Sequence, residues 1–507
     1  MLNDKLLSLE ALAVKSREFR QRGKRVVLCH GVFDLLHNGH IRHLQKAKEQ
    51  GDFLLVTLTA DTYVNKGPGR PVFAEQLRAE MISALACVDY VAVNHAATAI
   101  KVIQAMRPHV YAKGADYKSS KKDLTGNILH EKNTVKKYGG VVYYTDEITF
   151  SSSSLLNGYF GVFPEETKRY LQEFRKSSSD SAVIGRIKSL ASLRALVFGD
   201  AIVDEYCYTS PLGQTGKGNI LAVKYDSEEQ FAGGALAAAN HLSRFVGSVT
   251  VAAALGTRPS HEAFIRSKLT KGVRPQFFYI PNETTLVKRR FVDPDLAKLF
   301  EVYFYNEGAL PAPVDRQVCR WLEKMVGAFD IVVVPDFGNG FITPAMIKIL
   351  TRKAKFLAVN TQVNSGNRGY HVIHRYPRAD FVSLNEPELR LASHNRHDSL
   401  ETVAASVAKK VGASFIAVTR GTNGALMMDV KKKKVCSVPA LSTKVVDRIG
   451  AGDCFLSIAG ACLAGKLPAE TAAFVASAAA ALDVQIVCNR EPIDPVTLFK
   501  YVTTLLK

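Results

Sequence analysis

The sequence has few features of secreted, membrane-spanning or disulfide-bonded proteins. Its eight cysteines are scattered, and no two of them form a Cys-x-x-Cys pair. We therefore expect neither disulfides nor structural zinc, and we expect a reducing, cytoplasmic environment. No apolar run approaches the roughly 18 residues of a membrane span. Residues 1–5 lack the basic-then-apolar pattern that opens a signal peptide, so no membrane association is expected.

The chain also has no excess of acidic residues over basic ones. It carries 66 Lys and Arg against 47 Asp and Glu, a net charge of +19, and residues 1–160 contribute only +7 of this excess. The one dense basic run, Lys431–Lys434, stands between two strand-like segments and predicts a hairpin turn. A diffuse positive charge suits small anionic substrates, and the alternative of nucleic-acid binding rests on the charge alone. We therefore expect no nucleic-acid partner.

At 507 residues the chain is too long for one ordinary hydrophobic core. Apolar strand-like and amphipathic helix-like segments alternate from residue 24 to 150, which predicts a doubly wound α/β domain after a leading helix at 1–22. The expected strands are 25–28, 53–59, 90–93, 110–112 and 141–144, with helices at 74–85 and 97–106. A charged helix at 164–176 and a serine-rich joint at 177–181 precede a second α/β pattern, which opens with a strand at 195–198. The predicted domains are 1–160 and 193–507, with a helical linker at 161–192.

The most informative segment is Gly31–His40, which reads Gly-Val-Phe-Asp-Leu-Leu-His-Asn-Gly-His. It follows a strand-like run and precedes a helix-like one. Both His37 and His40 are therefore expected in the first turn of a helix that leaves a parallel strand. Free N–H groups at a helix start attract phosphate, and Gly39 lets a phosphate come close. The segment predicts a site that holds a triphosphate.

This segment resembles the signature of the cytidylyltransferase-like nucleotidyltransferases, and the likeness extends over about residues 24–157. Segments 65–67, 70–78 and 82–89 follow in the family's order. Segment 113–117 resembles a nucleotide-contacting turn of sugar-phosphate adenylyltransferases, and 149–154 resembles the closing Ser/Thr motif. The resemblance implies catalytic roles for His37, His40 and Lys66. The nucleotide-binding residues it implies are Val32, Phe33, Gly39, Lys113, Gly114, Asp116, Ser151, Ser152 and Ser153.

The reaction implied for this first domain is nucleotidyl transfer. A sugar or polyol phosphate oxygen attacks the α-phosphate of a nucleoside triphosphate, and pyrophosphate leaves with Mg²⁺. Positioning and charge neutralisation carry most of the rate in such a reaction. Asp146 and Glu147 stand where some relatives have a basic residue. The choice between ATP and CTP therefore stays open.

A second glycine-rich motif lies near the end of the chain. Gly450, Ala451 and Gly452 open an apolar helix, where backbone N–H groups can form an anion hole. Asp453 follows them directly. Its carboxylate is placed to take a proton from a sugar hydroxyl that attacks the γ-phosphate of ATP.

Further segments support a sugar kinase. Asp200 and Asp204 follow a strand and can accept hydrogen bonds from sugar hydroxyls, and Gly233-Gly234 allow close approach of a ligand. Segment 385–388 resembles a magnesium-placing Asn-x-x-Glu motif, and 418–424 resembles a nucleotide-side strand and turn. In this order they resemble the ribokinase (PfkB-type) sugar kinases over about residues 193–505. The substrate-binding residues that the resemblance implies are Asp200, Asp204, Gly233, Gly234, Lys288 and Arg290. The implied nucleotide-binding residues are Thr419, Gly421, Gly424, Gly450, Ala451 and Gly452. Asn385 and Glu388 are implied to place the metal ion.

Within that family, segments 284–290 and 333–340 are most similar to the heptose-phosphate kinases. A bifunctional heptose enzyme joins such a kinase to such an adenylyltransferase, and this chain resembles it with the domains in reverse order. Three departures stand near the acceptor pocket. Asn339 replaces a usual lysine, 360–362 read Asn-Thr-Gln in place of Asp-Pro-Lys, and Ala237 replaces an asparagine.

The leading hypothesis is therefore a bifunctional enzyme of nucleotide-activated sugar synthesis. Its fold would be a Rossmann-like nucleotidyltransferase domain followed by a ribokinase-like doubly wound α/β domain with a small lid sheet. The expected ligands are sugar phosphates, ATP or CTP, Mg²⁺ and a monovalent cation. A homodimer is expected, with 218–225 as a strand of the lid sheet. The alternative is an active nucleotidyltransferase whose degenerate kinase-like domain serves as a sensor or oligomerisation module.

Overall fold

The computed structural model describes residues 3–67, 70–114, 127–145, 163–306, 308–367, 369–442 and 444–507. The chain divides into two compact units. Unit 1 comprises Met1–Pro164 together with Phe499–Lys507, and unit 2 comprises Glu165–Leu498. Each unit is described by itself below.

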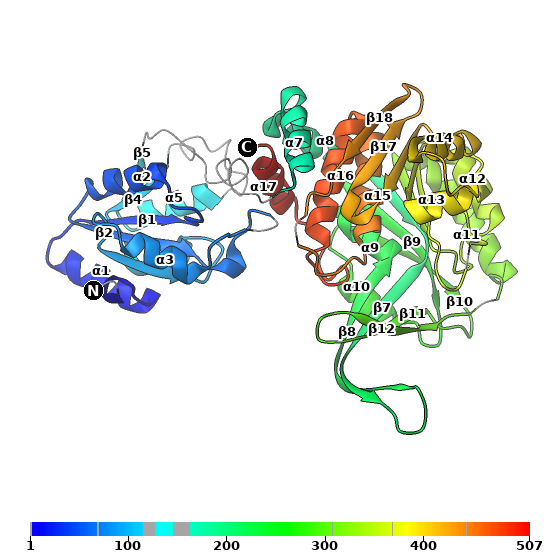
Figure 1. Cartoon of the computed structure of the whole chain (residues 1–507), viewed down its shortest axis with the longest axis horizontal. Coiled ribbons are helices and arrows are strands. Elements are labelled where there is room, and N and C mark those ends of the chain that lie inside the picture. Colours follow the sequence, from blue (N-terminus) through cyan, green and yellow to red (C-terminus); the bar gives the residue numbers. More distant parts are fainter. Residues whose placement is uncertain are drawn as a thin grey trace. The chain divides into compact units, whose positions relative to one another are not determined.

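Unit 1 is built on a five-stranded parallel sheet with the strand order β3-β2-β1-β4-β5 (Figure 1). The strands are β1 (Val26–Gly31), β2 (Phe53–Thr59), β3 (Tyr90–Asn94), β4 (Val110–Gly114) and β5 (Val141–Thr145). The helices are α1 (Leu9–Gln21), α2 (Asn38–Lys48), α3 (Glu75–Ser83), α4 (Ile100–Met106) and α5 (Asn127–Lys137), with short 3-10 turns η1 (Asn3–Lys5) and η2 (Asp61–Tyr63).

Both faces of this sheet are covered. Helices α2 and α3 contribute to one apolar cluster, and α1, α4 and α5 contribute to the other. The central strands are continuous apolar runs because neither of their faces meets water. The strand order reverses between β1 and β4, and ligands of open α/β sheets bind at the carboxyl ends of strands beside such a reversal. The His37–His40 segment directly follows β1.

The expected strands of unit 1 are confirmed, and two helices begin later than expected. Helix α1 begins at Leu9, where the Ser8 hydroxyl accepts a hydrogen bond from the Ala11 amide at 3.1 Å. Helix α4 begins at Ile100 because the Asn94 side chain donates to two carbonyls of the preceding loop, those of Ala96 and Thr98. Polar side chains compete with helical hydrogen bonding at both positions.

Unit 2 contains a nine-stranded sheet with the order β10-β9-β6-β13-β14-β15-β16-β17-β18. Its strands are β6 (Arg194–Phe198), β9 (Ser248–Gly256), β10 (Val273–Ile280), β13 (Ile331–Asp336), β14 (Leu357–Thr361), β15 (Phe381–Asn385), β16 (Phe415–Thr419), β17 (Ala425–Asp429) and β18 (Lys434–Val438). The pairs from β10 to β16 are parallel, whereas β17 and β18 are antiparallel. The β17–β18 turn contains Lys431–Lys433, which confirms the expected basic hairpin.

Helices cover both faces of this sheet, as Figure 1 shows. One face carries α9 (Ala235–Ser243), α15 (Ala451–Ala464) and α16 (Ala469–Asp483), and the other carries α11 (Ala312–Met325), α12 (Pro344–Lys353), α13 (Glu386–Ser393) and α14 (Leu400–Lys410). The remaining helices of this unit are α7 (Glu165–Ser177), α8 (Asp180–Ser189) and α10 (Glu262–Lys268), and short 3-10 turns complete it. Helix α17 (Pro495–Leu505) begins in unit 2 and ends in unit 1. Among the described residues, no helix has the length and apolarity needed to cross a membrane. The α/β class expected for both domains is confirmed.

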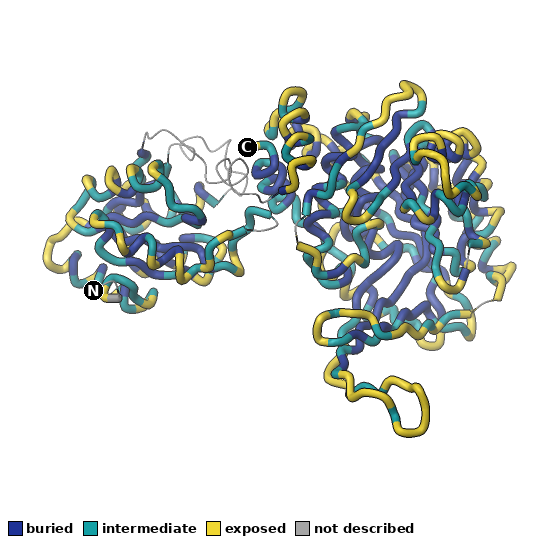
Figure 2. The backbone as a smooth tube through the Cα atoms, viewed as in Figure 1, coloured by how far each residue is buried: buried dark blue, intermediate teal, exposed yellow. Residues whose placement is uncertain are grey.

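A second, four-stranded sheet in unit 2 has the order β12-β11-β7-β8. Its strands are β7 (Ala201–Gln214), β8 (Leu221–Gly234), β11 (Leu286–Val292) and β12 (Lys298–Phe304). The β7–β8 hairpin extends far beyond its partners, and Figure 2 shows its end as exposed. The expected lid strand at 218–225 corresponds to the start of β8 and the turn before it.

Two segments differ from their expected setting. Helices α7 and α8, in the stretch expected as a linker, lie within unit 2, where Phe174 stacks on Phe474 at 4.4 Å between ring centroids. The expected flexible joint at 177–181 is a tight helix–helix turn, because the Ser179 hydroxyl caps α8 by accepting from the Ala182 amide. At the other end of the chain, Phe499–Lys507 belong to unit 1.

Candidate active sites

The first candidate site surrounds the start of α2. His37 is the N-cap of this helix, one residue earlier than expected, and its side chain makes no capping bond. His40 lies in the first turn, and the two imidazole rings stack with 3.9 Å between centroids. His40 Nδ1 lies 3.1 Å from the Leu35 carbonyl oxygen, which can only accept. The proton of neutral His40 is therefore on Nδ1, and Nε2 carries a lone pair.

Burial and neighbouring positive charges lower the pKa values of the basic side chains at this site. Burial lowers the pKa of His40 to about 3, with further lowering by His37, Lys66 and His43. Burial and the Lys66 charge also lower the pKa of His37. The pKa of Lys66 falls to about 8, chiefly through desolvation, although Asp34 opposes this shift. A bound triphosphate would favour the charged form of each group, so the three side chains suit a polyanionic ligand.

A fully buried arginine, Arg78, organises the loops around this site, and we did not assign it a role from the sequence. It donates to the carbonyl oxygens of Val32 at 2.5 Å, Thr59 at 2.9 Å and Phe73 at 2.8 Å, and it pairs with Asp61 at 2.5 Å. These contacts join the loop after β1 to the end of β2 and to the start of α3. The only sequence signal was its position at the end of the family-like segment 70–78.

Two further side chains hold the same loops in place. The buried Asp34 carboxylate accepts from the Val72 amide at 2.6 Å and lies 3.6 Å from the Arg70 guanidinium. Phe33 adopts a positive φ of 50° and packs its ring edge-on against His40 at 5.3 Å. The Val32 carbonyl is already bound by Arg78, so Val32 is fixed in the loop rather than open to a ligand through that oxygen.

The expected nucleotide turn after β4 is only partly described. The Lys113 side chain is buried, with its ammonium 3.3 Å from Glu131 and 3.4 Å from the His30 carbonyl oxygen. Its charge therefore serves an internal ion pair, while Gly114 faces open space. Asp116, Ser151, Ser152 and Ser153 lie outside the described residues.

The second candidate site lies at the start of α15 in unit 2. Gly450 precedes this 14-residue helix with a φ of 100°, and a Cβ there would lie 2.1 Å from Asn489 Oδ1. Only glycine fits both conditions. No heavy atom lies within 4 Å of the Cβ position of Gly452, so the helix start is open. The uncapped N–H groups of this first turn can receive an anion.

Asp453 stands in the same turn. Burial raises its pKa to about 7, and repulsion from Asp204 adds to the increase while Lys288 opposes it. A carboxylate with a pKa near neutrality is a stronger base than an ordinary aspartate, yet it is still largely ionised at slightly alkaline pH. The turn thus places a buried carboxylate with a raised pKa at an open helix start.

The glycine pair allows two aspartates to approach it. A Cβ on Gly233 would lie 1.9 Å from Asp204 Oδ2, and one on Gly234 would lie 2.6 Å from the Asp200 carbonyl oxygen. The Ala235 amide donates to that carbonyl at 3.0 Å. Burial and the nearby Asp336 raise the pKa of Asp200 to about 6. Two aspartates and two glycines from separate segments of the sequence therefore meet where β7 pairs with β8.

Strand β11 adds two cations to this junction. Arg290 forms an ion pair with Asp204 and lies 3.1 Å from Glu301. The buried Lys288 ammonium lies between the rings of Tyr303, at 5.3 Å, and Phe337, at 5.2 Å. Desolvation lowers the pKa of Lys288.

The loop after β13 borders a pocket beside Asp200. Asn339 Nδ2 donates to Asp200 Oδ2 at 3.5 Å, and the pocket is also lined by Glu283, Thr284 and Tyr305. Asp200 and Glu283 are the only charged side chains among the described residues that line it. The expected acceptor site is thus polar but contains no lysine or arginine in that part of its wall.

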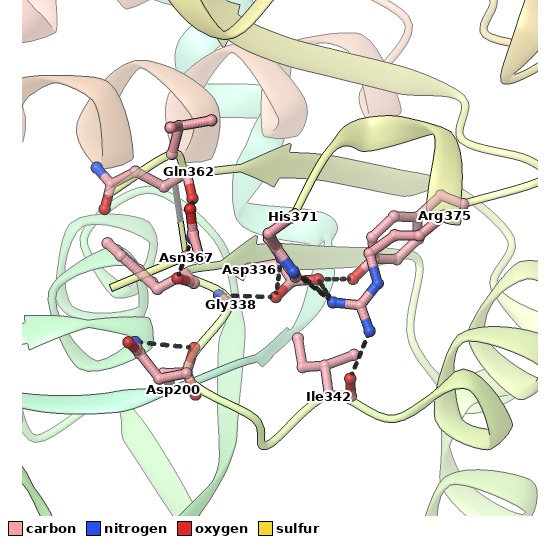
Figure 3. Close-up of polar contacts among 12 residues, drawn as sticks. Asp200, Asp336, Gly338, Ile342, Gln362, Asn367, His371 and Arg375 are labelled. Atoms are coloured by element: carbon pink, nitrogen blue, oxygen red, sulfur yellow. Dashed lines mark hydrogen bonds and ion pairs between the residues drawn. The ribbon is translucent and has the colours of Figure 1, made fainter. Parts of the chain in front are cut away.

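Behind this loop, basic side chains are engaged with the protein. Figure 3 shows His371 and Arg375 turned toward Asp336, which is buried. His371 Nε2 lies 2.8 Å and Arg375 Nη1 3.4 Å from this carboxylate, and the Tyr376 hydroxyl donates to it at 2.6 Å. Arg375 also donates to the Ile342 carbonyl oxygen. This network anchors the loop that carries Asn339.

Asn385 and Glu388 form a capping box at the start of α13. The Asn385 side chain accepts from the Glu388 amide at 2.8 Å, and the Glu388 carboxylate accepts from the Asn385 amide at 2.9 Å and the Val363 amide at 3.2 Å. Burial raises the pKa of Glu388 to about 7. The Asn360 side chain also hydrogen-bonds to this carboxylate, so of its roughly four acceptor positions about one remains for Mg²⁺ or one of its waters. This buried oxygen donor set fits a magnesium ion.

The turn for which the sequence predicts nucleotide contacts follows β16. Thr419 ends that strand, and Gly421 and Gly424 flank the 3-10 turn η8 (Gly421–Asn423) with φ values of 56° and 76°. A Cβ on Gly424 would lie 2.0 Å from the Val438 carbonyl oxygen, whereas Gly421 faces open space. Gly424 is therefore needed for packing against β18, and Gly421 is the residue of this turn that a nucleotide could approach.

Known proteins match both parts of the chain. Residues 193–493 match the pfkB family carbohydrate kinases, and residues 28–158 match the cytidylyltransferase-like family. The chain is 41% identical over 142 residues to the bifunctional protein HldE of Pelobacter propionicus, and the match covers 28% of each chain. It is also 41% identical over 137 residues to HldE of Helicobacter pylori strain G27, which covers 27% of this chain and 28% of that one. The matches thus span little more than a quarter of these relatives.

Solved structures resemble the kinase-like part. Phosphofructokinase-2 of Escherichia coli in complex with potassium has a TM-score of 0.50 at 18% identity, covering 61% of this chain and 99% of that one. The same enzyme in complex with substrates and products gives 0.50 at 16% identity, with the same coverage. These likenesses show a shared fold. The pfkB family match extends over more than half of the length of this chain. The chain therefore belongs to the pfkB family of carbohydrate kinases.

Proposed function

We propose that this chain is a bifunctional enzyme of nucleotide-activated sugar synthesis. The observation that carries the proposal is the presence of two separate sites, one in each unit. Unit 1 joins His37, His40 and Lys66 at a helix start, and unit 2 places Asp453 beside an open anion hole. The relatives named bifunctional HldE support the pairing. In this proposal the domains are 1–160 and 193–507, in the reverse of the order in the heptose enzymes.

In the kinase step, Asp453 takes the proton from the anomeric hydroxyl of a sugar as that oxygen attacks the γ-phosphate of ATP. The N–H groups at Gly450, Ala451 and Gly452 receive the negative charge that develops. Asp200 and Asn339 orient other hydroxyls. Mg²⁺, held near Asn385 and Glu388, would neutralise phosphate charge when it is bound.

In the nucleotidyltransferase step, the sugar 1-phosphate oxygen attacks the α-phosphate of ATP or CTP, and pyrophosphate leaves. The α2 N–H groups and Lys66 hold the phosphates. His40 donates to them through Nε2 once it takes up a proton, because its Nδ1 proton is committed to Leu35. Stabilisation of charge on the phosphates is the main contribution that these residues make.

The proposed ligands and setting follow from these two reactions. Both families use nucleoside triphosphates, usually with Mg²⁺, and we propose a monovalent cation for the kinase site. We further propose a cytoplasmic homodimer, with sugar phosphates as substrates and with neither nucleic acid nor membrane as a partner. The acceptor that we propose for the kinase belongs to the heptose 7-phosphate class or is related to it.

The pocket beside Asp200 favours an acceptor that differs from a heptose 7-phosphate. Its described lining has no basic residue, and Asn339 stands where a lysine would contact a phosphate. An acceptor without a phosphate at that end fits this wall best. The same departures support the second candidate function, a kinase-like unit that only binds a sugar and acts as a sensor or oligomerisation module.

One matrix of assays tests these proposals. Four nucleoside triphosphates are combined with a set of sugar 1-phosphates, and pyrophosphate release is measured. Sugars and sugar phosphates are then offered with ATP, and ADP release is measured. No pyrophosphate with any combination contradicts the nucleotidyltransferase. Pyrophosphate without ADP release from any sugar favours the sensor.

A further inference from the structure

The last nine residues of the chain, Phe499–Lys507, lie in unit 1 although they directly follow unit 2 in sequence. Tyr501 is only 1% exposed, and Val502 and Leu505 are fully buried. Burial of large apolar side chains stabilises by about 1.5–3 kcal/mol each. The segment is therefore a well-packed part of the structure rather than a loose tail.

Tyr501 packs directly on the turn that carries Lys66. Gly67 has a φ of +93°, and a Cβ at this position would lie 2.1 Å from Tyr501 Cδ2. Two requirements thus meet at Gly67, since the backbone favours glycine and the tyrosine ring occupies the space of any side chain. The ring forms a wall against which the Lys66-Gly67 backbone rests.

The same segment brings positive charge to Lys66. Lys500 and Lys507 both act on Lys66 electrostatically, together with Arg70, whereas Asp34 opposes them. His37 and His40, at the start of α2, also interact with Lys66 electrostatically, and burial lowers the pKa of both histidines. The described groups around Lys66 thus have a positive excess, which attracts a polyanion.

We propose that Phe499–Lys507 is part of the nucleotidyltransferase site, with Tyr501 as a positioning residue for the Lys66-Gly67 turn and Lys500 and Lys507 as added charge for the nucleoside triphosphate. The inference rests on the proposed nucleotidyl transfer. The proposal assigns Phe499–Lys507 to nucleotidyl transfer, although this segment directly follows the kinase-like unit in the sequence. Lys66 must be correctly placed for its charge to act on the reacting phosphate, and a displacement of about 1 Å can cost about 100-fold in rate.

The positioning role is tested in the full chain with Tyr501→Ala and Tyr501→Phe, assayed by pyrophosphate release. We expect Tyr501→Ala to lower kcat by about 10- to 100-fold with a smaller change in the KM for the sugar phosphate, because the turn loses its support. Tyr501→Phe keeps the ring and should restore activity to within about threefold. ADP release and tryptophan fluorescence from Trp321 in unit 2 verify that the rest of the chain is folded. Unchanged pyrophosphate release in Tyr501→Ala overturns the positioning role.

The charge role is tested by the double variant Lys500→Gln, Lys507→Gln, which changes side chains that are not fully buried. Removing two like charges raises the pKa of Lys66, so the loss of activity at alkaline pH should move from about 8 to a higher pH. The KM for the nucleoside triphosphate should increase. The control is Lys217→Gln, Lys431→Gln, which removes the same charge from exposed positions of unit 2 and should move neither quantity. The charge role is overturned if the pH at which activity declines on the alkaline side is unchanged in the Lys500, Lys507 variant. It is also overturned if this pH shifts equally in the control variant.

Failure of this inference differs from failure of the proposed function. If the unmodified protein releases no pyrophosphate with any substrate pair, nucleotidyl transfer itself is contradicted. If it releases pyrophosphate and all Tyr501 and lysine variants behave like it, only the role of Phe499–Lys507 is contradicted. In a third outcome, Tyr501→Ala loses activity and Tyr501→Phe loses it equally. This assigns the effect to the hydroxyl group and overturns the ring contact as its cause.

Discussion

Asp204 and Arg290 lie on neighbouring parallel strands, β7 and β11, and form a buried ion pair in the lid sheet. The Asp204 side chain also fills the space above Gly233, where a Cβ would lie 1.9 Å from Oδ2. The pair thus joins β11 to β7 close to the Gly233-Gly234 segment. Its two members are 86 residues apart in sequence.

Replacing Arg290 by glutamine should strongly destabilise unit 2. The change leaves the Asp204 carboxylate buried without its cation, which typically costs about 3–5 kcal/mol. The sole tryptophan, Trp321, lies in α11 of unit 2, so its fluorescence during urea unfolding reports on this unit. Arg266→Gln is the control, because its ion pair with Glu262 is largely exposed and contributes about 0–1 kcal/mol. Equal midpoints for the two variants would contradict the importance of the buried pair.

Replacing Asp453 by asparagine should abolish phosphorylation and spare nucleotidyl transfer. Asparagine keeps the shape of the side chain but cannot take a proton, and general-base catalysis is worth about 10²- to 10⁴-fold. ADP release should decrease by that factor, while pyrophosphate release stays at the level of the unmodified protein. Undiminished ADP release in Asp453→Asn would show that another group acts as the base.

Nucleotidyl transfer should decline at alkaline pH because Lys66 loses its proton. Its pKa in the free protein is about 8, so the charged form dominates below this pH and disappears above it. The kcat/KM for the nucleoside triphosphate should therefore decrease as the pH rises through about 8. Lys66→Gln should be about 10²- to 10³-fold slower and should lack this limb. Lys101→Gln, at an exposed lysine of the same unit, serves as the control and should keep the limb.

Binding of the nucleoside triphosphate should take up protons through His40. The pKa of free His40 is about 3, so the ring is neutral at pH 7, and the phosphate charge raises this pKa in the complex. Affinity should therefore increase as the pH falls through the pKa of the bound state, and it should go on increasing until the pH approaches the free value of about 3. Calorimetry in two buffers with different heats of ionisation measures the uptake. His40→Gln should remove it, whereas His95→Gln, at an exposed histidine, should not. Equal uptake in both variants would assign the proton to another group.

Introducing a lysine at Asn339 should improve the use of phosphorylated acceptors by the kinase. Asn339 contacts Asp200 at the edge of a pocket whose only charged lining residues in the described structure are acidic. A lysine there adds an ammonium group for a sugar phosphate. The KM for such acceptors should decrease by about tenfold, the equivalent of roughly 1.4 kcal/mol. The KM for neutral sugars in the same variant is the internal control, and a parallel decrease in both would contradict a phosphate-specific effect.

Much of the architecture could be predicted from local patterns in the sequence. The apolar strands of unit 1, the first strand of unit 2, the helix after His37 and the basic turn at Lys431–Lys433 follow from short-range periodicity, and the structure contains them. The glycine positions at Gly233, Gly450 and Gly424 were also visible in the sequence. Their reasons were not, because each depends on a neighbour from a distant segment.

The roles of several polar side chains were decided by tertiary packing. Lys113 was expected to face a nucleotide, but the fold directs it to Glu131 on α5. Glu388 reads as a metal residue in sequence, and the structure also uses it to cap α13. Arg78 shows no distinguishing local pattern, although its guanidinium group joins three loops. A charged side chain selects its partner in three dimensions, so local spacing gives no information about that choice.

The sequence by itself determined two α/β domains, their order, and the residue types of two motifs, Gly31–His40 and Gly450–Asp453. These properties depend on hydrophobic period and on glycine and histidine spacing, which act over a few residues. Only the tertiary structure placed Phe499–Lys507 in unit 1, beside the Lys66-Gly67 turn. More than 400 residues separate Gly67 from Tyr501 in the sequence. Their contact exists because folding buries the tyrosine ring where the glycine leaves space.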